Sequence, residues 1–195
     1  MTRTARKRAQ RMQQLERSAA KIFAERGYEG ANFEEIAAQL DLRGPSLYHY
    51  FSSKEELFLR CVRTCWEEVM GRLEEIAGSD RDAVDILRSL FREQVFIELR
   101  DYPEFVPLFL RVQVPIPAIR AELHELRRSH EAVFKRVAGA VQRERGLDAS
   151  QARVWLLVAF GALSYLQEWY DPAGPTGIDQ LADMIAETLV DPFRR

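Results

Sequence analysis

The sequence predicts an all-α protein of about nine helices, and three observations lead to this fold class. First, apolar residues recur three and four positions apart through most of the chain, which is the spacing of one helix face. Second, no alternating apolar and polar runs and no hairpin dipeptides follow Asp80, so strands are not expected there. Third, several segments open with Ser, Asn or Asp followed three positions later by Glu or Gln, which is typical of helix N-termini.

Composition limits the class of protein. A chain of 195 residues has room for one or two small domains with a sizeable core. Cys61 and Cys65 lie one helical turn apart and form no disulfide framework, and small buried hydrophobes are favoured over a redox pair. The longest uncharged apolar run, 154–166, is too short to span a bilayer, and no signal peptide is visible. We expect a soluble cytoplasmic protein without a membrane partner.

Charge is spread unevenly along the chain. The formal net charge is −2, yet residues 1–60 hold 11 Lys and Arg against 8 Asp and Glu. Within residues 1–17 the balance is 6 against 1. A basic end on a weakly acidic protein suits local attraction to phosphate, but a solvated tail explains it equally well.

The first helix is expected from near Ala5 or Arg8 to Arg26, with Gly27 ending it. Its buried stripe contains Leu15, Ala19, Ile22 and Phe23.

Residues 32–54 predict two short helices joined by a tight corner, followed by a third helix start. Asn32 with Glu35 forms a capping box for the first helix, and the corner is expected at residues 40–42. The second helix is expected at about 44–51, with Leu47 and Phe51 on one side. Its other side is polar, aromatic and free of acids, as expected of a helix that lies in a DNA groove.

From Leu15 to about Val62 the chain resembles the DNA-binding domain of the TetR family of bacterial repressors. The resemblance is carried by FAERGYEGANFEEIA (23–37) and SLYHYFSSKEELF (46–58). It implies a three-helix domain with a helix-turn-helix, whose second motif helix reads operator DNA in the major groove. It places base contacts at Pro45, Ser46, His49 and Tyr50, and phosphate contacts at Tyr48 and Lys54. For both tyrosines, core packing is the alternative.

Two positions depart from the family pattern. Arg43 stands where Ser or Thr usually caps the recognition helix, and Arg cannot accept that hydrogen bond. Pro45 stands where many relatives carry Gly, although proline is tolerated in a first turn. We therefore expect Arg43 to contact DNA, at guanine or phosphate.

Ser53 and Glu56 predict a capping box that opens a long helix to about Ala77, with Gly78 ending it. In the family this helix links the DNA-binding domain to a regulatory domain. The expected domains are therefore 1–53, with the helix-turn-helix, and 54–195, for ligand binding and dimerisation.

The next helix is expected from an Asp80 cap to about Arg100. Residues 103–118 carry four prolines among bulky apolar residues, so short helical pieces that wall a pocket are expected. A long helix follows at about 118–145, with His130 on its apolar stripe; a hydrogen-bonded core histidine is the alternative to a ligand contact. The residues expected to contact a ligand are Phe91, Phe105, Phe109, His130, Trp155 and Trp169, with core filling as the alternative.

Asp148 and Gln151 predict the start of a helix whose residues 155–166 are apolar on every side. Such a helix must be buried all round, which favours a second subunit against one face. The last helix is expected to start with Thr176 as its cap. The residues expected at a two-fold dimer interface are Leu157, Gly161, Tyr165, Leu181 and Ile185.

Residues 168–175, EWYDPAGP, resemble the end of this helix in a branch of the family that senses acyl-CoA and lipid-type ligands. This shorter resemblance implies an acyl-CoA or comparable apolar effector. Arg92, Arg100 or Arg111 could meet its anionic group, but surface ion pairs explain these arginines equally well.

These observations favour a homodimeric transcriptional repressor that a small molecule releases from a palindromic operator. The first alternative is a DNA-binding protein of the same fold controlled by a protein partner, as in nucleoid or division control. The second is a helical interaction module that does not bind DNA. No nucleophile motif, phosphate loop or metal-ligand spacing is visible, so no enzyme, metal or cofactor is expected.

Overall fold

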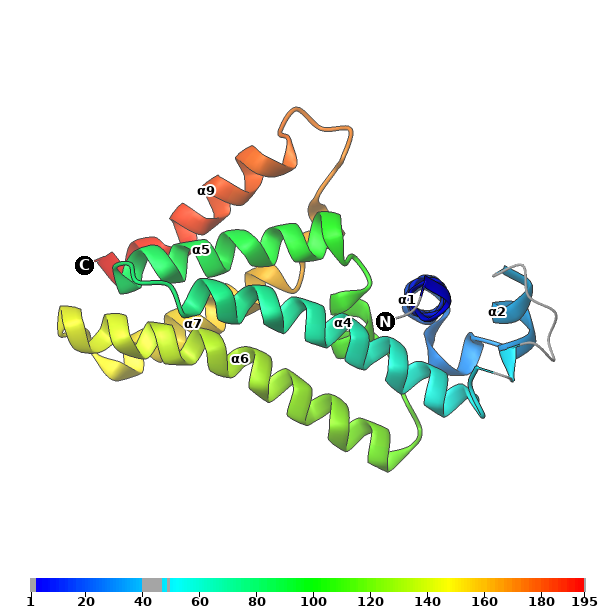
Figure 1. Cartoon of the computed structure of the whole chain (residues 1–195). Coiled ribbons are helices and arrows are strands. Elements are labelled where there is room, and N and C mark those ends of the chain that lie inside the picture. Colours follow the sequence, from blue (N-terminus) through cyan, green and yellow to red (C-terminus); the bar gives the residue numbers. More distant parts are fainter. Residues whose placement is uncertain (1–2, 40–46, 49, 195) are drawn as a thin grey trace. The chain divides into compact units, whose positions relative to one another are not determined.

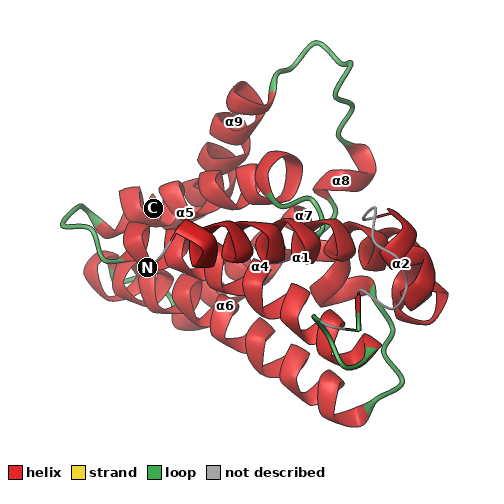
Figure 2. Ribbon diagram, turned by 45° about the vertical axis from the view of Figure 1, so that its right-hand side comes forward, coloured by secondary structure: helices red, strands yellow, loops and turns green. Residues whose placement is uncertain are grey.

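The structure is a computed structural model that describes residues 3–39, 47–48 and 50–194. Its elements are α1 (Arg3–Gly30), α2 (Phe33–Gln39), α4 (Lys54–Ala77), α5 (Ala83–Phe96), η1 (Ile97–Asp101), η2 (Pro107–Arg111), α6 (Pro117–Arg145), α7 (Ala149–Leu163), α8 (Leu166–Trp169), α9 (Ile178–Val190) and η3 (Asp191–Arg194). All of these are helical, and the described residues contain no strand (Figure 2), which confirms the all-α fold class. No helix in this part of the chain is long and apolar enough to cross a membrane.

The chain forms two compact units, and each is built from two stretches. The first unit contains residues 1–68 and 104–124, and the second contains 69–103 and 125–195. The predicted domains divide the chain at the start of α4, whereas these units divide it within α4 and α6.

Aromatic rings fill the core of the first unit. The ring of Phe58 meets Phe23 edge-on, with 5.0 Å between centroids, and meets Tyr28 edge-on at 5.3 Å. Gly27 adopts a φ of 73°, where the sequence predicted the end of the first helix, and a further turn then runs to Gly30. The predicted stripe of α1 is buried, at Leu15, Ala19, Ile22 and Phe23.

The start of α2 confirms one half of the predicted capping box. The backbone N–H of Glu34 donates to the side-chain oxygen of Asn32 at 2.8 Å, so Asn32 is the cap. The carboxylate of Glu35 instead forms an ion pair with Arg26 at 2.6 Å, which ties α2 back to α1.

The start of α4 is capped as expected, with one change of partner. The hydroxyl of Ser53 accepts from the backbone N–H of Glu56 at 3.2 Å. The Glu56 carboxylate does not close the box on Ser53, because it accepts from both the backbone N–H and the hydroxyl of Ser52, at 2.7 and 2.6 Å. These hydrogen bonds lower the pKa of Glu56.

Helix α5 begins two residues later than predicted. Asp82, not Asp80, caps α5 by accepting from the N–H of Val84 at 2.9 Å. Helix α5 starts where its buried residues start, because Ala83 and Val84 are both buried. Figure 1 shows α5 beside α9, and these two helices are in contact.

The predicted N-terminal cap of α7 is confirmed, whereas the predicted cap of α9 is not. The side chain of Asp148 accepts from the N–H of Gln151 at 2.9 Å. The predicted cap of the last helix, Thr176, is wrong: Gly177 takes that position, with extended backbone and no side-chain hydrogen bond. The first helical bond runs from the N–H of Leu181 to the carbonyl of Gly177, so α9 begins one residue later than a Thr176 cap requires.

Candidate functional sites

Four of the predicted DNA-contact residues, Arg43, Pro45, Ser46 and His49, lie outside the described residues. Their predicted base contacts therefore stay predictions. The other three, Tyr48, Tyr50 and Lys54, can be placed.

The turn from Leu47 to Phe51 has one buried side and one exposed side. Leu47 and Phe51 are buried and share a backbone hydrogen bond of 3.0 Å, as the predicted helical face requires. Tyr48 is 56% exposed, and its ring rests on the ring of Phe33 with 4.7 Å between centroids. Tyr50 is half-buried, so packing and DNA contact both remain open for it. The contact with Phe33 therefore orients the Tyr48 ring while much of its side chain stays exposed.

Lys54 joins the start of α4 to the last turn of α1 and to the residue that follows this helix. Its ammonium donates to the backbone carbonyls of Tyr28 at 2.9 Å and Ala31 at 3.2 Å, and lies 4.5 Å from the centroid of the Tyr28 ring. The sequence did not predict these bonds. An ammonium has three N–H donors, so one remains for a phosphate oxygen.

A buried carboxylate connects α1 to α4. Glu16 is 4% exposed and accepts from the guanidinium of Arg60 at 3.0 and 2.9 Å and from the hydroxyl of Thr64 at 2.8 Å. This contact was not predicted from the sequence, although Glu16 lies four and seven residues before the buried Ala20 and Phe23. That spacing was the signal.

Neither thiol nor metal chemistry is visible in the described part of the chain. Cys61 and Cys65 are free and buried, and burial raises the pKa of both thiols, which keeps them protonated. No three His, Cys, Asp or Glu side chains among the described residues gather closely enough to hold a metal ion.

The predicted ligand contacts fall into both compact units. Phe105 and Phe109 belong to the first unit, with their rings 4.6 Å apart. The other four, Phe91, His130, Trp155 and Trp169, belong to the second unit.

Within the second unit, two of these four residues, Phe91 and His130, contact the same aromatic ring. The rings of Phe91 and His130 lie 5.8 and 5.4 Å from the ring of Phe134. Trp155 packs instead on Phe193 at 5.7 Å, and Trp169 is 54% exposed. These contacts place Phe91 and His130 in one aromatic cluster.

His130 begins a polar chain inside the second unit. Its Nε2 lies 3.0 Å from the amide oxygen of Gln94, whose nitrogen donates to the Glu98 carboxylate at 2.9 Å. Because the amide oxygen can only accept, His130 donates through Nε2. Burial lowers the pKa of His130 to about 4, so the imidazole is neutral at ordinary pH. This arrangement fits the hydrogen-bonded core histidine that the sequence offered as an alternative.

A further polar side chain, Gln167 of α8, bonds to the backbone of Glu98. The side chain of Gln167 donates to the backbone carbonyls of Glu98 at 2.8 Å and Pro103 at 2.6 Å, on either side of the end of η1. Gln94 and Glu98 are 3% and 2% exposed, and their spacing of four residues on an apolar helix face could have revealed them. Neither residue was predicted as a buried polar group.

Two arginines proposed for an anionic ligand group make ion pairs. Arg92 bonds Asp183 at 2.5 Å, and Arg100 bonds Asp101 at 2.8 Å. Both guanidinium groups also stack on the ring of Phe96, at 4.6 and 4.2 Å. These contacts favour the ion-pair alternative for the two residues.

Helix α7 is buried on one side only. Ala152, Leu156, Ala159 and Leu163 face the core. An exposed strip runs along the opposite side, and we call it the α7 strip: Val154 (55% exposed), Val158 (62%), Gly161 and Tyr165 (65%). Of the residues predicted for a dimer interface, Gly161 and Tyr165 lie in this strip. On α9, Leu181 is buried within the chain and Ile185 is half-buried, while Met184 is 56% exposed.

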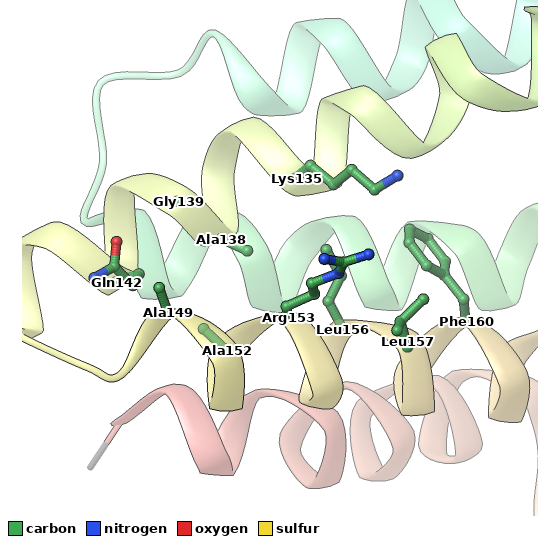
Figure 3. A pocket seen from close by; sticks show the side chains of 10 residues that line it. All are labelled: Lys135, Ala138, Gly139, Gln142, Ala149, Ala152, Arg153, Leu156, Leu157 and Phe160. Atoms are coloured by element: carbon green, nitrogen blue, oxygen red, sulfur yellow. The ribbon is translucent and has the colours of Figure 1, made fainter.

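A groove of about 430 Å³ lies between α6 and α7 (Figure 3). It is lined by Lys135, Ala138, Gly139, Gln142, Ala149, Ala152, Arg153, Leu156, Leu157 and Phe160. Leu157 was expected at a dimer interface, and the groove was not predicted from the sequence.

Comparison with known protein families gives two matches that together span most of the chain. The profile described as "Bacterial regulatory proteins, tetR family" matches residues 17–61. A second, described as "Tetracyclin repressor-like, C-terminal domain", matches residues 80–192, which is more than half of the chain.

Curated relatives and solved structures agree with these matches. The HTH-type transcriptional activator FasR of Mycolicibacterium smegmatis is 29% identical over 148 residues, 75% of this chain and 66% of FasR. The biofilm operon negative transcriptional regulator IcaR of Staphylococcus aureus is 27% identical over 92 residues, 47% of this chain and 50% of IcaR. The matched part thus spans less than two thirds of either relative. The crystal structure of AibR with isovaleryl coenzyme A and operator DNA covers 92% of this chain and 98% of AibR, with a TM-score of 0.78 at 20% identity, and shows the same fold.

Proposed function

The chain belongs to the TetR family of bacterial regulatory proteins, and we propose that it is a cytoplasmic repressor that binds a near-palindromic operator as a two-fold dimer. Its relatives are DNA-binding transcriptional regulators, not enzymes. A small apolar or acyl-CoA-like ligand releases it from the operator.

The observation that carries this proposal is the turn at residues 47–51. Burial of Leu47 and Phe51 holds the turn against the core, while Tyr48 stays exposed on the other side. Tyr48 then contacts phosphate with its hydroxyl, and Lys54 adds a charged donor. Pro45, Ser46 and His49 read base edges, and Arg43 contacts guanine or phosphate.

The dimer is supported by the α7 strip. A monomer that exposed Val154, Val158 and Tyr165 together would leave a continuous apolar surface in water. Gly161 in the middle of the strip has no neighbour within 4 Å of the position of a Cβ, so another helix can approach closely there. A two-fold pair suits operator half-sites one helical turn, roughly 34 Å, apart.

The ligand class is supported by residues 168–175 and by the aromatic cluster of the second unit. Phe134 is in contact with Phe91, His130 and Phe160, which gives an apolar lining with one neutral imidazole. AibR, which shares the fold, was crystallised with isovaleryl coenzyme A. A ligand that binds better to the DNA-free pose lowers operator affinity by the ratio of its two affinities.

The test is selection of an operator from random duplex DNA, followed by titration of the complex with acyl-CoA thioesters. We expect a near-palindrome bound by two chains and released by one thioester class. Failure to enrich any sequence contradicts DNA recognition. A selected operator that no metabolite releases contradicts the ligand step and favours control by a protein partner.

A further inference from the structure

The groove between α6 and α7 opens on a different side of α7 from the α7 strip, and its lining includes the buried residues Ala152 and Leu156. At 100° per residue, the α7 residues that line it, centred on Ala149, Arg153 and Phe160, are roughly 150° around the helix from the strip at Val154, Val158 and Tyr165. A partner packed on the strip therefore does not have to fill the groove. Its volume of about 430 Å³ falls in the ~300–1,000 Å³ range of small-molecule sites.

The lining combines an apolar floor with two cations. The floor is formed by Ala138, Gly139, Ala149, Ala152, Leu156, Leu157 and Phe160. Lys135 reaches in from α6 and Arg153 from α7, and Figure 3 shows both in the space between the helices, with Phe160 nearby. None of the described residues that line the groove is acidic.

The two cations leave about one positive charge for a ligand. Lys135 is paired with Glu131 at 2.6 Å. Arg153 is exposed, and its side chain has no ion pair with any described residue. A guanidinium presents parallel N–H donors that match the two oxygens of a carboxylate. A single carboxylate satisfies this charge, whereas a nucleotide-linked thioester brings several phosphates that the groove does not balance.

We propose that this groove binds a small molecule with an apolar chain and one terminal carboxylate. The chain lies on Leu156, Leu157 and Phe160, and the carboxylate accepts from Arg153. The site borders the aromatic cluster around Phe134, with Phe160 common to both, and goes beyond the operator binding proposed above.

Isothermal titration of the purified full-length protein without DNA tests this inference, with decanoate as the probe and decanol and decanoyl-CoA as comparisons. We expect one decanoate per chain, bound more tightly than either comparison. Arg153→Gln should weaken decanoate at least about tenfold, since a charge-assisted hydrogen bond is lost, and should change decanol binding less than twofold.

A pair of glycine variants tests the location. A Cβ at Gly139 meets only the flexible end of Arg143, at 3.5 Å, so Gly139→Leu folds and its side chain fills the groove. Gly71→Leu is the control, because Gly71 is another helical glycine with open space around it. Gly139→Leu should abolish decanoate binding and Gly71→Leu should preserve it. Decanoate that does not bind, binds Gly139→Leu unchanged, or ignores Arg153→Gln overturns the inference. Because no DNA is present, each of these outcomes leaves operator recognition untouched.

Discussion

The two compact units differ in how completely they bury their apolar side chains. Among the described residues of the first unit, the large apolar side chains left exposed are Tyr48 and Leu110. The second unit exposes six, at Val154, Leu157, Val158, Tyr165, Trp169 and Met184. Burying an apolar side chain of this size stabilises by about 1.5–3 kcal/mol, so the second unit leaves substantial stabilisation unused.

The two units also differ in where their polar contacts lie. In the first unit, Glu16, Lys54 and Glu35 fasten helices to each other within the chain. In the second unit, the buried chain of His130, Gln94 and Glu98 lies inside while α7 presents an apolar outer side. We infer that the described contacts of the first unit are made within the chain, whereas the exposed apolar side of α7 in the second unit suits contact with another molecule.

The largest expected effect comes from a charge in the α7 strip. Val158→Arg places a cation at a two-fold interface next to its own copy, and should convert the dimer to a monomer. Operator affinity should then fall by about 100-fold or more, because two linked half-site contacts become independent. Sedimentation velocity and gel-shift titration measure the two effects.

Ala132→Arg is the control for this variant, because it adds the same charge at an exposed position of α6. Its dimer and its operator affinity should match those of the unaltered protein. If Val158→Arg stays dimeric, the second unit uses another face.

A smaller effect is expected from Glu16→Ala in the first unit. It leaves Thr64 and Arg60 without their buried acceptor, so the free energy of unfolding should fall by about 2 kcal/mol. Urea denaturation measures this loss. Since Glu16, Arg60 and Thr64 belong to the first unit and the α7 strip belongs to the second, the proposed dimer should persist at the same concentration in sedimentation. A monomeric Glu16→Ala protein speaks against independent units.

Protonation of His130 should lower the free energy of unfolding by an amount similar to that of Glu16→Ala, and this loss depends on pH. Its pKa falls from 6.5 to about 4 in the folded chain, so the unfolded chain takes up a proton between these values. The free energy of unfolding should therefore drop as the pH falls from 6.5 towards 4, and stay constant above. The residue keeps some solvent contact, so we expect a drop of about 2 kcal/mol.

Denaturation across this pH range, compared with His130→Gln, checks the origin of the drop. The variant keeps a donor for Gln94 but does not titrate, so its stability should change less over the range. His124→Gln removes an exposed histidine and should behave like the unaltered protein. Equal slopes for all three proteins assign the pH dependence to other groups.

The sequence predicted best what depends on near neighbours. The caps at Asn32 and Asp148 and the buried pair Leu47 and Phe51 need only residues within one helical turn, and the structure has them. The resemblance in residues 23–37 and 46–58 predicted the family, because its fixed spacings belong to one family.

What depends on distant segments was missed. The shift of a helix start from Asp80 to Asp82 follows from which residues of α5 are buried, and no local rule contains that information. The bond between His130 and Gln94 joins residues 36 positions apart. The groove arises only from the separation of α6 and α7, so single-helix patterns could not predict it.

The smallest expected effect lies where the first unit meets DNA. Lys54→Ala removes a cation whose remaining N–H we propose contacts phosphate. Affinity should fall by about three- to tenfold for the selected operator and for unrelated DNA alike, because phosphate carries no sequence information. The slope of log affinity against log salt should become shallower by about 0.9, one phosphate contact.

Lys54→Ala also removes the hydrogen bonds of Lys54 to two backbone carbonyls, and this loss can be measured as a change in stability. Loss of its contacts with Tyr28 and Ala31 should also cost about 1 kcal/mol of stability, so affinities are compared at temperatures well below unfolding. Lys21→Ala, which removes an exposed cation of α1, controls for net charge. An affinity loss confined to the operator assigns Lys54 to sequence reading, and an unchanged salt slope assigns it to fastening α4 alone. In that second case Lys54 serves only to hold the start of α4 against Tyr28 and Ala31.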